Sequence, residues 1–265
     1  MTSRTVSGAM APTARTVLGT GRVRPVIKEP VWKPEIPFYF YAGGLGGASA
    51  GLAALSELRG DEVLARRAWA AALAGAAASP ALLIADLGVP RRFFNMLRMF
   101  KVTSPMSVGS WLLTGFGPAT GLAALDAWTG ALPRGLAVGA KLSSALLGLP
   151  VATYTAALIA NTAVPVWHEA RAELPVVFAA GAAASAGAAA LMATPVRDAA
   201  PARRLAVGGA VAELATVTLM ERRLGKLAAL VHDLGQPKRF LHMLRVFKVT
   251  SPMSVGSWLL TGFGP

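Results

Sequence analysis

The sequence contains no cysteine, so this chain cannot by itself hold an iron–sulfur cluster or a thiolate-bound metal. Histidine is nearly as scarce, since His168, His232 and His242 are the only three. A membrane haem ligated on both faces needs two histidines at the same depth on neighbouring helices, and these positions offer no such pair. We therefore expect neither haem nor an iron–sulfur cluster in this chain.

Charged residues are also few, and acidic residues are the fewest. Only 15% of the residues are charged, with 13 Asp and Glu against 26 Lys and Arg, whereas a soluble domain has about 25%. Alanine and glycine fill long tracts, as at 42–55 and 179–193, and such small residues let helices pack closely in a bilayer. The cations behind the net charge of +13 line the connecting loops, so we expect no nucleic-acid partner. The composition predicts an integral membrane protein.

Apolar stretches of about 20 residues, the length that crosses a membrane as a helix, recur along the chain. No stretch alternates with a period of two residues over the length that a membrane β-barrel needs. The sequence predicts an all-α polytopic membrane bundle with six full spans and a partial seventh beginning near residue 252. The full spans are expected at residues 36–57, 68–87, 105–128, 136–160, 175–195 and 203–220.

The N-terminal residues 1–35 differ from the rest, because they are basic and have no continuous apolar core. We expect a poorly ordered tail here and no cleaved signal peptide, followed by the membrane bundle over residues 36–225. Lys and Arg are more than twice as frequent on the side of the membrane that holds this tail. The positive-inside rule therefore places the N-terminus in the cytoplasm.

One segment occurs twice, at 86–118 and at 233–265, with 28 of 33 residues identical. The residues before the two copies do not match, which favours a recent copy or an aberrant addition over an old duplication. Residues 252–265 would reach only about 21 Å as a helix, short of a hydrocarbon core of about 30 Å. We expect residues 226–265 to end within a helix and to pack loosely.

The stretches at 30–52, 86–111, 154–178 and 201–225 resemble the polysulfide reductase NrfD family of membrane subunits, particularly its actinobacterial members. Among them are "PVWKPEIPFYFYAGGLGGASAGL" and "DLGVPRRFFNMLRMFKVTSPMSVGSW". The resemblance covers about 30–225, and after Gly225 the chain departs from the family pattern. It implies a haem-free bundle, of eight spans in the family, in the inner (plasma) membrane of a bacterium.

The resemblance also implies a function and partners. The chain would exchange electrons between a membrane quinone, menaquinone or ubiquinone, and a ferredoxin-like iron–sulfur subunit. That subunit would in turn serve a catalytic subunit, often a molybdopterin enzyme. Two alternatives remain open: a structural membrane anchor without a quinone site, and a transporter rich in small residues.

Two carboxylates are expected within the bilayer, where an acid is costly and therefore suggests a function. Asp86 ends the second predicted span and Glu213 lies within the sixth. We expect both to take part in quinone binding or proton transfer. The alternative for Asp86 is a helix-end ion pair with Arg91 or Arg92, and the alternative for Glu213 is a buried polar contact.

Three further residues are expected near the membrane surface on the same side as Asp86. Tyr41 opens the first span, where it could hydrogen-bond a quinone carbonyl or belong to the interfacial aromatic belt. His168 and Glu169 follow the fourth span. Histidine titrates near neutral pH, as proton exchange with quinol requires, although a solvated interfacial histidine is the alternative.

The loop at 88–105 combines cations with apolar residues in the manner of an amphipathic segment lying in the membrane interface. We expect Arg91, Arg98 and Lys101 to dock the iron–sulfur subunit. Contact with membrane lipid is the alternative. The sequence shows no Gly-rich phosphate loop and no nucleophile elbow. The resemblance implies a subunit of a larger oxidoreductase, either non-catalytic or quinone-reactive.

Overall fold

The computed structural model describes residues 35–161 and 165–225, in which helices joined by short turns are the only regular secondary structure. The predicted all-α bundle is therefore confirmed. The N-terminal tail, the second copy of the repeat and the partial seventh span lie outside the described residues. The long helices are α1 (Glu35–Leu58), α2 (Glu62–Leu87), α4 (Pro105–Thr129), α5 (Arg134–Ala160), α7 (Leu174–Ala193) and α8 (Ala200–Leu224). The short ones are α3 (Pro90–Met96), α6 (Pro165–Glu169), η1 (Ala170–Ala172) and η2 (Val196–Asp198).

Caps explain where several of these helices begin and end. The Asp61 carboxylate accepts a hydrogen bond from the Leu64 N–H at 3.1 Å, and this cap starts α2 six residues before its predicted span. Gly88 ends α2 in the left-handed region, with φ of 70°. Gly130 ends α4 in the same way. The remaining long helices match their predicted spans to within a few residues.

Three of the described helices, α2, α5 and α7, are long and apolar enough to cross a membrane. The helices α1, α4 and α8 have spanning length, but glycine, hydroxyl and charged residues lower their hydropathy. The membrane-spanning character of α2, α5 and α7 thus agrees with the sequence. For the other three it stays a prediction.

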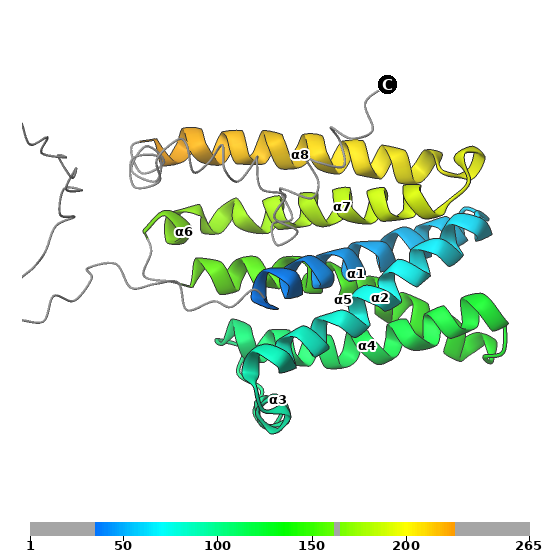
Figure 1. Ribbon diagram of the computed structural model, residues 1–265, viewed down its shortest axis with the longest axis horizontal. Helices are drawn as coiled ribbons and strands as arrows, with labels where there is room; N and C mark the ends of the chain where they lie inside the picture. The colour runs from blue at the N-terminus through cyan, green and yellow to red at the C-terminus, as the bar shows by residue number, and fades with distance from the viewer. Residues whose placement is uncertain (1–34, 162–164, 226–265) are drawn as a thin grey trace, which may run out of the picture. The chain divides into compact units, whose positions relative to one another are not determined.

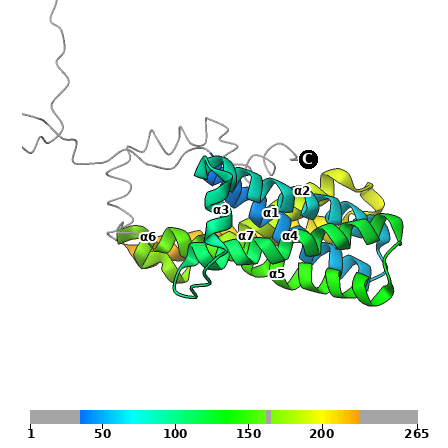
Figure 2. The same cartoon turned by 90° about the horizontal axis from the view of Figure 1, so that it is seen from below.

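The long helices run side by side, and α1 packs against α2, α5 and α7 (Figure 1). The helix α8 packs on α7, and α4 packs on α5 and α2. The short helix α3 runs across the direction of the long helices, as Figures 1 and 2 show together. This arrangement makes α1 the central helix of the bundle.

Backbones approach very closely along α1, and glycine makes this possible. A Cβ atom on Gly75 of α2 would lie 2.6 Å from the Cα atom of Gly46. A Cβ atom on Gly47 would collide with the carbonyl oxygen of Gly148 on α5. Helices in a membrane gain little from the hydrophobic effect, so this close contact is a principal source of their association.

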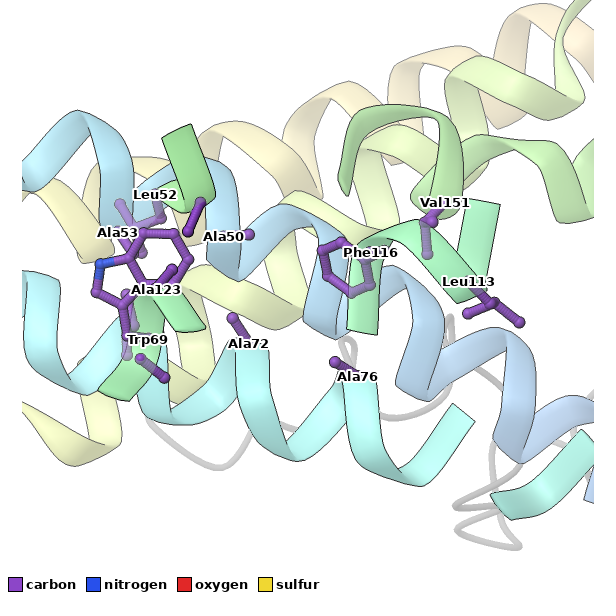
Figure 3. Packing of buried hydrophobic residues seen from close by; sticks show 14 of the residues in the cluster. Ala50, Leu52, Ala53, Trp69, Ala72, Ala76, Leu113, Phe116, Ala123 and Val151 are labelled. Carbon is purple, nitrogen blue, oxygen red and sulfur yellow. The ribbon is translucent and has the colours of Figure 1, made fainter. Parts of the chain in front are cut away.

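Small side chains also face the few large ones in the core. The rings of Trp69 and Phe116 are fully buried, and alanine methyl groups surround them (Figure 3). A buried hydrogen bond of 2.7 Å between the hydroxyls of Thr120 and Ser144 joins α4 to α5. The interior is therefore held by packing and by isolated polar contacts.

We expect Gly47→Ala to destabilise the bundle, because the added methyl group meets the α5 backbone, which cannot move aside as a side chain would. The expected loss is about 2 kcal/mol, or about 6 °C in Tm, measured by thermal unfolding in detergent. Gly51→Ala is the matched control, since a Cβ atom at Gly51 meets nothing within 4 Å. The control should equal or exceed the wild-type Tm, and equal Tm values for both variants would contradict the proposed role of this contact.

Candidate functional site

Successive long helices run in opposite directions, so one end of the bundle gathers the start of α1, the end of α2 and the end of α5 (Figure 1). The short helices α3 and α6 lie at this same end. Most of the residues that the sequence singles out are found here. The opposite end holds the connections between α1 and α2 and between α4 and α5.

Four aromatic rings from three helices meet near this end. Tyr39 on α1 and Tyr154 on α5 make an edge-to-face contact with ring centres 6.5 Å apart. Phe40 makes a similar contact with Phe178 of α7 at 6.2 Å. Gly109 of α4 leaves room for the Tyr154 ring, which a Cβ atom at that position would overlap. The helices thus bring together an aromatic, largely apolar wall at this end of the bundle.

The hydroxyl of Tyr154 is buried and has no hydrogen-bond partner in the described part of the chain. A buried polar group without a partner is costly and is expected to have a partner outside the described residues. Tyr154 is not among the residues that the sequence singles out. It opens the resembling stretch 154–178 and lies near the end of a predicted span, but neither fact distinguishes it from other aromatic residues.

Asp86 lies in the last turn of α2 and is half-buried. No ion pair joins it to Arg91 or Arg92 within the described residues, so the alternative of a helix-end ion pair is not found. Arg92 instead donates to the backbone carbonyl of Leu87 at 3.0 Å. The Asp86 carboxylate therefore stays unpaired in the described part of the chain.

The residues after α5 form an exposed corner. His168 and Glu169 are exposed on α6. Arg223 at the end of α8 donates to the Glu169 carbonyl oxygen at 3.0 Å and pairs with the Glu173 carboxylate. Tyr41 is half-buried on α1. Within the described residues, Asp86, His168 and Tyr41 share this end of the bundle without direct contact.

Glu213 lies apart from this group. It is half-buried midway along α8, where its carboxylate faces Gly181 of α7. A Cβ atom on Gly181 would lie 3.2 Å from the nearest Glu213 oxygen, so the glycine leaves space for the acid. The structure therefore places Glu213 in the α7–α8 contact and not beside Asp86.

The docking residues expected from the sequence form an exposed surface, which we call the α3 surface. Arg91, Arg98 and Lys101 are all exposed, and large apolar side chains such as Phe94 and Phe100 are exposed among them. Within the loop at 88–105, Pro90–Met96 forms a short helix, and Pro105 begins α4. The mixture of cations and exposed apolar side chains suits either a protein partner or lipid.

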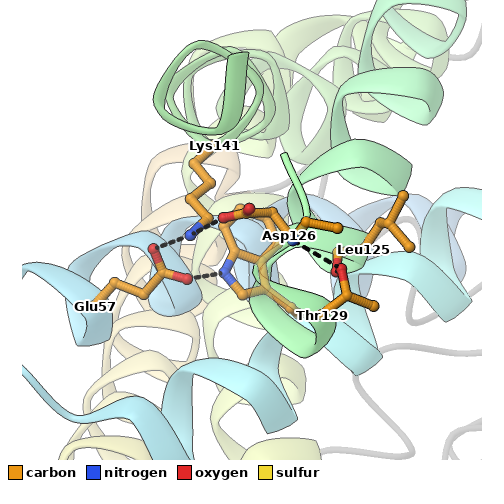
Figure 4. Close-up of polar contacts among 7 residues, drawn as sticks. Glu57, Leu125, Asp126, Thr129 and Lys141 are labelled. Carbon is orange, nitrogen blue, oxygen red and sulfur yellow. Dashed lines mark hydrogen bonds and ion pairs between the residues drawn. The ribbon is translucent and has the colours of Figure 1, made fainter. Parts of the chain in front are cut away.

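A polar cluster occupies the opposite end of the bundle, and the sequence analysis did not predict it. The Lys141 ammonium lies 3.0 Å from the Glu57 carboxylate and 2.9 Å from the Asp126 carboxylate. The indole N–H of Trp69 donates to Glu57 at 2.9 Å (Figure 4). This cluster, called the Lys141 cluster below, joins α1, α2, α4 and α5.

The described residues contain no group of three His, Asp or Glu side chains that could hold a metal ion. The all-helical bundle, with three described helices long and apolar enough to cross a membrane, defines the class of polytopic membrane proteins.

The family model for polysulphide reductase NrfD matches residues 24–224. The chain belongs to this family, as its motifs suggest. Family membership makes it a membrane subunit of the polysulphide reductase type or a related complex linked to quinone. A comparison with curated proteins finds no match to this chain.

Proposed function

We propose that this chain exchanges electrons between a membrane quinone and the iron–sulfur cluster of a partner subunit in a bacterial plasma membrane. The observation that carries the proposal is the buried, unpartnered Tyr154 hydroxyl in an aromatic wall, at the bundle end that holds Asp86. A quinone has a flat apolar ring and two carbonyl oxygens. Aromatic rings and a buried hydroxyl donor are groups that fit it.

The chemistry assigns separate tasks to these residues. Oxidation of a quinol releases two electrons and two protons, and reduction of a quinone takes them up. Tyr154 donates a hydrogen bond that orients the ring, and Asp86 exchanges the protons with water at the membrane surface. His168, exposed at the same end, is a second group through which protons can pass.

The α3 surface would dock the partner. Its exposed cations attract an acidic surface, and exposed apolar side chains such as Phe94 and Phe100 give a contact that excludes water. In this arrangement the partner's cluster approaches the bundle end that holds Asp86. The iron–sulfur subunit then passes electrons to or from a catalytic subunit of the molybdopterin class.

The triple variant Arg91→Gln, Arg98→Gln and Lys101→Gln tests the docking. We expect it to lower recovery of the iron–sulfur subunit on gentle purification by about tenfold, since each exposed charge contributes up to about 1 kcal/mol. Raising the ionic strength should weaken the wild-type complex and affect the variant less. The control is Arg203→Gln with Arg204→Gln, two exposed cations at the opposite end of the bundle. Equal recovery of the partner with all three proteins would contradict the docking role.

Tyr154→Phe tests the quinone contact, because it removes only the hydroxyl. We expect the KM for a water-soluble quinone analogue to rise about fivefold, the effect of one lost hydrogen bond of about 1 kcal/mol. The control is Thr153→Val, since the neighbouring Thr153 hydroxyl bonds back to its own helix at the Leu149 carbonyl, at 3.2 Å. An unchanged KM in Tyr154→Phe would show that Tyr154 does not contact the quinone. Absence of any quinone reactivity in the wild-type complex would favour the alternative of a structural membrane anchor without a quinone site.

A further inference from the structure

A cavity of about 300 Å³ opens beside the Lys141 cluster, at the end of the bundle opposite Asp86. Its walls come from the end of α1, the turn at Gly60, the start of α2, the end of α4 and the start of α5. Gly60, Ala65 and Ala127 line it without bulky side chains. Its size falls at the lower limit of small-molecule sites, which suits a compact polar group.

The charges that line this cavity are of both signs, with one negative charge in excess. Glu57, Glu62 and Asp126 supply carboxylates, while Arg66 and Lys141 supply cations. Lys141 is already shared between Glu57 and Asp126 at about hydrogen-bond distance. Arg66 and Glu62 form a weaker ion pair, because their charged groups are 3.7 Å apart and both side chains are more than half exposed. The outer pair is therefore available to a ligand with a positive and a negative group.

Large exposed apolar side chains neighbour the lining residues along the chain. Leu58, Leu125 and Trp128, each next in sequence to a lining residue or to the turn at Gly60, are 80%, 45% and 49% exposed. Trp128 lies near the end of α4, and if α4 spans the membrane as predicted, an indole there is typical of the depth where headgroups meet acyl chains. A ligand here would thus meet charges inside and apolar side chains outside. Only an amphiphile satisfies both.

We propose that this cavity binds the headgroup of a zwitterionic phospholipid that carries a primary amine, as phosphatidylethanolamine does. The ammonium group lies against the carboxylates, to which it can donate three hydrogen bonds. The phosphate lies against Arg66, whose guanidinium is suited to phosphate oxygens. The acyl chains lie along Leu125 and Trp128. This site is independent of the proposed quinone chemistry.

The charge balance selects among lipids. The excess carboxylate disfavours an anionic headgroup such as phosphatidylglycerol, and a choline headgroup has no N–H to donate. We therefore expect binding of phosphatidylethanolamine to be about tenfold tighter than binding of either other lipid. That ratio corresponds to one charge-assisted hydrogen bond, about 1.4 kcal/mol.

The test is tryptophan fluorescence of the full chain in detergent micelles, titrated with lipids brominated in their acyl chains. Brominated phosphatidylethanolamine should quench at about one-tenth the concentration that brominated phosphatidylcholine or phosphatidylglycerol needs. Trp128→Phe should remove most of this lipid-specific quenching. Arg66→Gln should weaken it about fivefold, whereas Arg204→Gln, an exposed cation at the same end of the bundle, should not.

The three variants leave the residues of the Lys141 cluster unchanged, so we expect them to fold. Tm values equal to that of the wild type will establish this. Soluble phosphoethanolamine, which lacks acyl chains, should fail to displace the lipid at matched concentration. Equal affinity for the three lipids, tighter binding of phosphatidylglycerol, or equal effects of Arg66→Gln and Arg204→Gln would each overturn the proposal. Displacement by the free headgroup would overturn the assignment to a lipid.

Discussion

Asp86→Asn is expected to lower quinone-linked electron transfer by about 100-fold, the lower range for loss of a proton-transferring group. The substitution keeps the size of the side chain and removes only its ability to exchange a proton. The carboxylate is half-buried without an ion-pair partner in the described residues, so the change breaks no contact of the fold. The measurement is steady-state turnover of the purified complex with a quinone analogue, together with the Tm of each variant.

Two further variants serve as a control and a comparison for Asp86→Asn. Asp198→Asn, at the opposite end of the bundle and paired with Arg197 among the described residues, should keep wild-type turnover. His168→Ala should act in the same direction as Asp86→Asn but more weakly, because an exposed histidine can be replaced by water. If Asp86→Asn and His168→Ala both turn over at the wild-type rate, the proton path lies elsewhere in the bundle.

Lys141→Met is expected to destabilise the bundle by about 3 kcal/mol, because it leaves two partly buried carboxylates facing each other without a cation. The Asp126 and Glu57 side chains are only 12% and 26% exposed, so water cannot fully replace the lost ammonium group. The expected fall in Tm is about 9 °C, measured in detergent at neutral pH.

A combined variant separates charge from shape at this cluster. Adding Glu57→Gln and Asp126→Asn to Lys141→Met removes the uncompensated charges and should recover more than half of the lost stability. Lys101→Met is the control, since the exposed Lys101 side chain has no carboxylate partner in the described residues. A loss in Lys141→Met no larger than in Lys101→Met would show that the cluster does not stabilise the fold.

Helix positions could be predicted from the sequence because hydropathy and capping are local. Pro105 and Gly130 bound α4 within a residue of its predicted limits, since proline favours a first helical turn and glycine tolerates the left-handed cap. The start of α2 was set six residues late. The charged residues around Glu62 and Arg66 lower the hydropathy there, although the Asp61 cap extends the helix through them.

The candidate site was only partly predictable. Asp86 could be found because an acid at the end of an apolar span is conspicuous by itself. Tyr154 could not be distinguished from other aromatic residues. Its importance comes from a buried ring, for which Gly109 leaves room, and from a hydroxyl without a partner in the described residues. These are properties of three helices together.

The Lys141 cluster illustrates the same limit over a longer distance. Glu57 and Lys141 are 84 positions apart, and each looks like an ordinary charge at the end of a span. Their contact depends on the close approach of α1 to α5 at Gly47 and Gly148. The sequence of one helix does not predict this ion pair, because the pair depends on how two helices pack together.

That backbone contact has a further consequence for charge movement. Because α1 meets α2 and α5 through glycine, the spacing of these helices is fixed by main-chain atoms and not by adaptable side chains. Tyr39 and Tyr154 are carried on the two helices so joined, which holds their rings at a set separation. In the proposed transfer of electrons and protons, little of this framework would have to rearrange, which would keep the reorganisation energy of the transfer small.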